Sequence, residues 1–123
     1  MIKIGITERG DAGLDFSWYN KRKNYDGLIL ITKKLSDEFI EKAMDTNCIV
    51  HATITGWGGT ILEPNVPSVD ESFYYLDNLF NCLDSDRIVL RIDPIIPTKE
   101  GIERALKVYE KFCKENCNVY KQR

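Results

Sequence analysis

Hydrophobic and polar residues follow two different periods along the chain. Four short runs of β-branched and other apolar residues have the length and alternation of strands, and they cover residues 2–7, 28–32, 49–55 and 88–93. Between these runs, apolar residues recur three or four positions apart, as they do along one side of an amphipathic helix. The pattern therefore predicts strands and helices in alternation.

Three of the predicted helices begin at residues that commonly cap a helix. Ser36 and Thr98 each precede a stripe of apolar residues, and Ser68 with Glu71 forms a Ser-x-x-Glu capping box. A weaker and shorter helix is predicted within residues 14–23. Because a helix separates each strand from the next and a last helix follows the fourth strand, the order predicts a parallel sheet with right-handed crossovers.

The two faces of this sheet are predicted from odd and even positions, since successive side chains of a strand point to opposite sides. One face is apolar and should pack on the helices: Ile2, Ile4, Ile6, Val50, Ala52, Ile54, Ile88, Leu90 and Ile92. The other face is mostly polar: Lys3, Gly5, Thr7, His51, Thr53, Thr55, Val89, Arg91 and Asp93. A sheet covered by helices on both sides would need two apolar faces.

A polar inner face fits the lumen of a (β/α) barrel, whose complete form has eight strands in about 250 residues. We therefore predict an α/β fold: a (β/α)4 half-barrel with parallel strands, a polar inner face and helices on the outer face. The 123 residues, 43% of them hydrophobic, fit one globular domain over residues 1–123. Disorder is excluded by that apolar content.

The net charge and the cysteine content limit the partners and the cellular compartment that we expect for the protein. The net charge of −2 disfavours duplex nucleic acid as a partner. Apolar runs stay well short of the roughly 20 residues that span a bilayer, and the N-terminal residues lead into a strand without a signal-peptide pattern. We expect a cytoplasmic protein without a membrane partner, whose four cysteines are reduced thiols.

Candidate ligand-binding residues lie at the carboxyl ends of the third and fourth strands. Arg91 and Asp93 share a face about 6.5–7 Å apart along the strand, and they form either an internal ion pair or a ligand site. His51, the only histidine, lies beside Thr53 and Thr55 on the inner face. It is either a satisfied core residue or part of the same site.

Two loops add further candidates. Arg9 and Asp11 follow the first strand, where glycines permit a tight turn and a guanidinium suits a carboxylate or a phosphate. A solvated turn is the alternative, because the spacings of phosphate-binding glycine loops are absent. The loop over residues 56–67 has no periodicity, and Trp57, Glu63 and Asn65 are its candidate ligand contacts. An ordered crossover is the alternative there.

At these positions the sequence resembles the radical-SAM-like proteins labelled DNA repair photolyases, which are kin of spore photoproduct lyase. The order and spacing agree from Arg9 to about Ile96. The matching residues are Arg9 with Asp11, Thr32-Lys33, Thr53-Ile54-Thr55-Gly56-Trp57-Gly58, Glu63-Pro64-Asn65-Val66-Pro67 and Arg91-Ile92-Asp93-Pro94-Ile95. The resemblance implies a barrel architecture and a pocket at the strand ends.

The chain departs from that group in its cysteines. The group's three-cysteine motif holds an iron–sulfur cluster and S-adenosylmethionine, whereas this chain has only Cys113-x-x-x-Cys117-x-x-Tyr120. We therefore expect no cofactor, with the cluster and S-adenosylmethionine possible only if a partner completes the site. Radical chemistry is not carried over from the resemblance.

The functional prediction is a small half-barrel protein that binds a polar or anionic ligand at the carboxyl ends of its strands. One alternative is a truncated or partner-dependent radical-SAM-like enzyme, and another is an interaction or inhibitor module. Whether the protein is an enzyme stays open. Because four parallel strands leave unpaired edges, a homodimer is expected.

Overall fold

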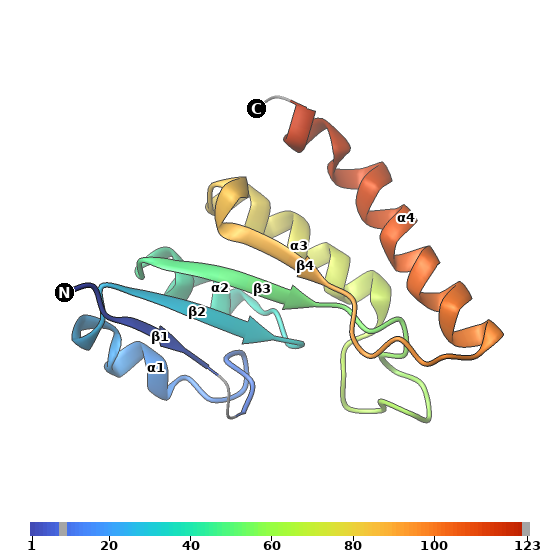
Figure 1. The fold of residues 1–123 in the computed structure, drawn as a ribbon, viewed down its shortest axis with the longest axis horizontal. Coiled ribbons are helices and arrows are strands. Elements are labelled where there is room, and N and C mark those ends of the chain that lie inside the picture. Colours follow the sequence, from blue (N-terminus) through green and yellow to red (C-terminus); the bar gives the residue numbers. More distant parts are fainter. Residues whose placement is uncertain (8–9, 122–123) are drawn as a thin grey trace.

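The computed structural model describes residues 1–7 and 10–121, with side chains as far as Lys114. Four parallel strands form one sheet in the order β1-β2-β3-β4, with helices between them (Figure 1). The strands are β1 (Ile4–Ile6), β2 (Gly27–Thr32), β3 (Cys48–Thr53) and β4 (Ile88–Arg91). The helices are α1 (Ser17–Asn20), η1 (Arg22–Asn24), α2 (Asp37–Met44), α3 (Val69–Cys82), η2 (Ser85–Arg87) and α4 (Lys99–Lys121).

The sheet is open, so the predicted α/β half-barrel is confirmed. The predicted helix starts are confirmed too. The Ser36 hydroxyl accepts from the Phe39 N–H at 3.1 Å, Ser68 accepts from Glu71 at 3.2 Å, and Thr98 accepts from Gly101 at 3.0 Å. Each cap satisfies one of the N–H groups that the first turn of a helix leaves without a partner.

The core lies between the sheet and the helices that cover its outer face. Leu30, Val50 and Ile88 are register partners on three adjacent strands, and all three are buried. Phe39 of α2 and Phe73 of α3 close this layer from the helix side, with 0% and 2% of their surface exposed. The predicted apolar face is thus the buried face in β3 and β4.

The first strand faces the opposite way from the prediction. Ile4 and Ile6 lie on the open face, 52% and 49% exposed, while Gly5 pairs in register with the buried Leu28. A Cβ at Gly5 would stand 2.6 Å from Leu28 Cδ2 and 3.1 Å from the Tyr25 ring. Side chains of neighbouring elements therefore fill the place that an isoleucine of β1 was expected to take.

The open face has two zones as a result. Toward the amino ends of the strands it is apolar, with Ile4, Ile29 and Ile49 close to one another around a hollow. Toward the carboxyl ends it becomes polar, with Thr53 and Arg91 as register partners on β3 and β4. This second zone is where ligands of (β/α) barrels gather.

Candidate functional site

A hollow of about 430 Å³ opens at the carboxyl ends of the strands. Every strand of the sheet, or the loop that follows it, contributes to its wall. The lining residues are Thr7, Gly10, Asp11, Ile31, Lys33, Thr53, Arg91 and Asp93. Of the predicted site residues, the structure thus brings together Asp11, Thr53, Arg91 and Asp93.

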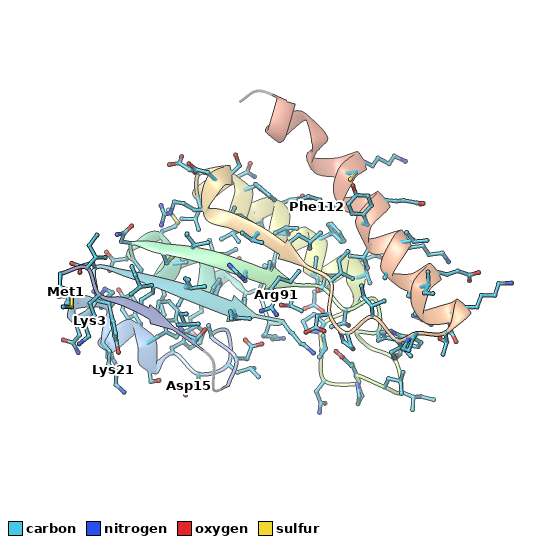
Figure 2. All side chains as sticks on the ribbon, in the orientation of Figure 1. Met1, Lys3, Asp15, Lys21, Arg91 and Phe112 are labelled. Carbon is cyan, nitrogen blue, oxygen red and sulfur yellow. The ribbon has the colours of Figure 1, made fainter. Side chains whose placement is uncertain are left out.

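Arg91 is the cation on the β4 side of this hollow (Figure 2). Its side chain is partly buried, and its register partner Thr53 is 6% exposed. Within residues 1–7 and 10–114, whose side chains are described, the guanidinium forms no ion pair and no hydrogen bond. Arg91 and Asp93 therefore line one hollow without closing into the internal pair that was one of the two sequence interpretations.

Lys33 supplies a second cation directly after β2. Its Nζ lies 3.3 Å from Glu63 Oε1, an ion pair that ties the loop over residues 56–67 to the end of β2. The Glu63 side chain is only 15% exposed, and its Oε2 is buried without a hydrogen-bond partner among the described residues. Glu63 thus reaches the rim of the hollow through Lys33 and does not line it.

Asp11 shapes the hollow through its own hydrogen bonds. Its Oδ1 accepts from the Thr32 hydroxyl at 2.5 Å and from the Gly13 N–H at 2.7 Å, and its Oδ2 accepts from the Lys33 N–H at 2.6 Å. Both oxygens are thereby committed to the loop after β1 and the end of β2. Through these hydrogen bonds Asp11 fixes the position of the backbone at Lys33.

His51 lies on the same face as Thr53, two residues earlier in β3, and its register partners are Ile31 and Val89. Burial lowers the pKa of the imidazole below its usual value, and the nearby charge of Arg91 lowers that pKa further. The ring is consequently neutral at neutral pH. His51 is not among the residues that line the hollow, although its register partner Ile31 is.

The other predicted site residues that the structure describes do not line the hollow. The Thr55 hydroxyl accepts from the Trp57 N–H at 3.0 Å and so holds a turn. Trp57 is buried, and the Arg104 guanidinium lies 4.3 Å from its ring centroid. Asn65 is exposed on the loop over residues 56–67. Arg9 lies outside the described residues.

Sequence reasoning missed Lys33 and Thr7 as parts of the wall. Both residues were visible as strand ends: Thr7 closes the first predicted strand, and Lys33 directly follows the second. Since the ends of parallel strands meet at one edge of a sheet, every polar residue at such an end is a candidate.

The arrangement can bind a small polar molecule that carries an anionic group. The Arg91 guanidinium presents a planar set of donors for a carboxylate or a phosphate, and Lys33 adds a point charge. Asp93 is exposed at the same hollow and can accept from hydroxyl or ammonium groups. No three His, Cys, Asp or Glu side chains gather as a metal-binding group in the described part of the chain.

Comparisons with known proteins identify one family. A family model described as "Domain of unknown function (DUF1848)" matches residues 17–122. No curated protein and no solved structure matches the chain. None of the helices among the described residues has the length and apolar character that a membrane crossing demands.

Proposed function

The chain belongs to the DUF1848 family, and we propose that it binds a small polar ligand through an anionic group at the carboxyl ends of β1 to β4. The observation that carries this proposal is the Arg91 side chain. It is partly buried and lines a hollow of about 430 Å³ without a counter-charge bonded to it among the described side chains. Even partial removal of a cation from water costs free energy unless an anion or bound water compensates the charge.

Lys33 and Thr53 support the same assignment. Lys33 stands across the hollow from Arg91 on a segment that Asp11 fixes, so that two cations approach one volume from different strands. Thr53 ends β3, the strand between β2 and β4, and its hydroxyl lines the hollow between the two cations. Asp93 lines the same hollow and can accept hydrogen bonds from hydroxyl or ammonium groups of the ligand.

Isothermal titration calorimetry with inorganic phosphate and with acetate tests the proposal. We expect saturable heat from the wild-type protein and a loss of affinity of at least tenfold in Arg91→Gln, which removes a charge-assisted hydrogen bond. Arg22→Gln is the matched control, because Arg22 pairs with Asp45 away from the hollow. Arg9→Ala belongs in the same series, since Arg9 was a predicted ligand contact.

Equal heats from wild type and Arg91→Gln would remove Arg91 from the site and overturn the proposal.

Kinship with photolyase-like proteins is not part of this proposal, because the family model that matches the chain describes a domain of unknown function. A cytoplasmic location remains a proposal that rests on the free thiols of Cys48, Cys82 and Cys113.

We also propose that the protein forms a homodimer. In the part of the chain that the structure describes, β1 pairs only with β2 and β4 pairs only with β3. Each of these strands therefore has one edge whose backbone N–H and C=O groups can pair with another chain.

A further inference from the structure

The outer edge of β4 borders an apolar groove. The Arg91 carbonyl accepts from the Ile54 N–H on the β3 side, so the backbone groups of Leu90 face the opposite, outer edge. The groove there has a volume of about 430 Å³. Its lining holds no charged residue: Ile88, Val89, Leu90, Ile92, Tyr109 and Phe112.

Helix α4 stands over the place where a fifth strand would pair with β4. It packs on α3 through the Phe80 and Phe112 rings, 6.3 Å apart, and through the buried Val108. Beyond that contact, Ile102, Leu106 and Tyr109 stay 49–56% exposed. In a parallel sheet the helix after a strand covers that strand and the next one, and here the next position beside β4 is vacant among the described residues (Figure 1).

The β1 end of the sheet has the complementary character. Its edge strand carries Ile4 and Ile6 on the open face, and Gly5 presents no side chain on the helix face. Next to Gly5 lies a hollow of about 360 Å³ that Trp18 and Tyr25 line together with charged residues, among them Asp15 and Lys21. A strand with this shape can lie beside β4 while the exposed stripe of α4 packs against the hollow next to that strand.

We propose that a second copy of this chain supplies the missing neighbour, with β1 of each copy pairing parallel to β4 of the other. Four plus four strands close an eight-stranded barrel, and a two-fold axis satisfies both edges of both copies at once. The open face then becomes the barrel interior. Branched apolar side chains fill such interiors in layers, and the exposed Ile4, Ile6, Ile49 and Val89 supply them from each copy.

This pairing extends the proposed function, and what it implies for the ligand rests on that proposal. The hollow at Arg91 is walled by one copy only, and closure of the barrel places the strand ends of the second copy opposite it. The ligand would then lie at a rim formed by eight strand ends. A small anion bound there is shielded from water on the side that is open in one copy.

Sedimentation equilibrium with charged edge variants tests the pairing. The wild-type protein should have twice the 14.2 kDa chain mass at micromolar concentrations. Ile4→Glu places a charge on the β1 edge, and Leu106→Glu places one on the exposed stripe of α4; each should sediment as a single chain. Met44→Glu is the control, because Met44 is 54% exposed on α2, far in the sequence from either edge, and should remain a dimer.

Mixing the two edge variants gives the decisive result. Each variant alone has one damaged edge in both of its interfaces, whereas a mixed dimer has one interface with both changes and one that is entirely wild type. The equimolar mixture should therefore contain more dimer than either variant does alone. Circular dichroism melts that match the control show that both variants fold.

A wild-type mass of 14.2 kDa, or a mixture that is no more dimeric than its components, would overturn the pairing. The second result also overturns it when the wild type is a dimer, because face-to-face association would show no such rescue. Arg91→Gln should remain a dimer. Loss of phosphate binding and loss of the dimer are thus separate outcomes, and each counts against only its own proposal.

Discussion

Residues of one type have different tasks within the same hollow. Asp11 and Asp93 both line it, yet the Asp11 carboxylate accepts three hydrogen bonds from its own chain, while Asp93 is exposed and forms no ion pair with any described residue. A carboxylate whose lone pairs are committed to backbone N–H groups determines the conformation of a loop. A carboxylate without such partners is available to a ligand.

Replacing Asp11 should therefore cost stability. Asp11→Ala leaves the Gly13 and Lys33 N–H groups without their acceptor, and we expect a loss of about 1–3 kcal/mol of unfolding free energy. Urea denaturation followed by circular dichroism measures it. Glu41→Ala, an exposed change on α2, is the control and should leave the midpoint unchanged. Equal midpoints for both variants would show that the three hydrogen bonds are not needed for folding.

The neutral state of His51 makes stability sensitive to acid. Its pKa in the folded protein lies below the value of about 6.5 of an unfolded chain, so the unfolded state binds the proton first as the pH falls. The unfolding free energy should therefore decrease as the pH falls from about 6.5 through the lower, folded-state pKa. Because His51 is the only histidine, His51→Gln should flatten this part of the curve. Thermal melts between neutral and mildly acidic pH measure the difference, and parallel curves would contradict it.

At the scale of elements, the loop over residues 56–67 fastens α4 to the sheet. Arg104 donates to the Gly56 carbonyl at 2.8 Å and lies over the Trp57 ring. Gly56 has a φ of +74°, a conformation that suits glycine, and a Cβ there would stand 3.3 Å from Arg104. The tryptophan that we predicted as a ligand contact is thereby packed against a helix that follows it by more than forty residues.

Removing that fastening should loosen α4 more than the rest of the protein. Arg104→Ala loses the hydrogen bond to Gly56 and the cation–π contact with Trp57, for an expected loss of about 1–3 kcal/mol. Hydrogen exchange should accelerate first in α4. Lys107→Ala, also on α4 and exposed, is the control. Uniform acceleration across the whole sheet would show instead that α4 opens only with global unfolding.

At the scale of the whole molecule, the sheet separates two functions along its strands. The buried face is apolar and packs on the helices, the amino-terminal half of the open face is apolar and exposed, and the carboxyl ends gather Arg91, Lys33 and Thr53 around one hollow. A molecule built this way can change its ligand contacts through loop residues while its core stays the same. Ligand binding at those ends should consequently raise the unfolding free energy of the whole protein.

Phosphate should raise the thermal midpoint through this linkage. At a concentration one hundred times the dissociation constant, a ligand that binds only the folded state adds about 2.7 kcal/mol. Phosphate also stabilises proteins in general, so the comparison is with Arg91→Gln at equal phosphate concentration. The wild-type midpoint should rise more than that of the variant. Identical increases would assign the effect to the solvent and not to the site.

Much of the local structure could be predicted from the sequence. The caps at Ser36, Ser68 and Thr98 were found because a helix start depends on residues three positions apart. The predicted strands overlap all four observed ones because burial of one face imposes a period of two. The short helix within residues 14–23 appears as α1 and η1 in nearly the predicted place.

The candidate site could be predicted in part. Thr53, Arg91 and Asp93 were found because they end strands whose two faces are clearly different in character. The face of β1 was wrong, since three isoleucines alternating with Lys3 and Gly5 fit either orientation of an edge strand, and the packing of Leu28 and Tyr25 over Gly5 decides it. No local pattern contains that packing.

The sequence by itself determined the elements, their order and the polar strand ends, because hydrogen bonding within a turn of helix and alternation within a strand are local. Only the tertiary structure decided what the remaining polar residues do. Asp11 finds the end of β2 more than twenty residues away, Lys33 meets Glu63 thirty residues on, and Trp57 lies against Arg104. These contacts depend on the register of parallel strands and on how helices pack over them. The spacing of neighbouring residues in the sequence predicts neither.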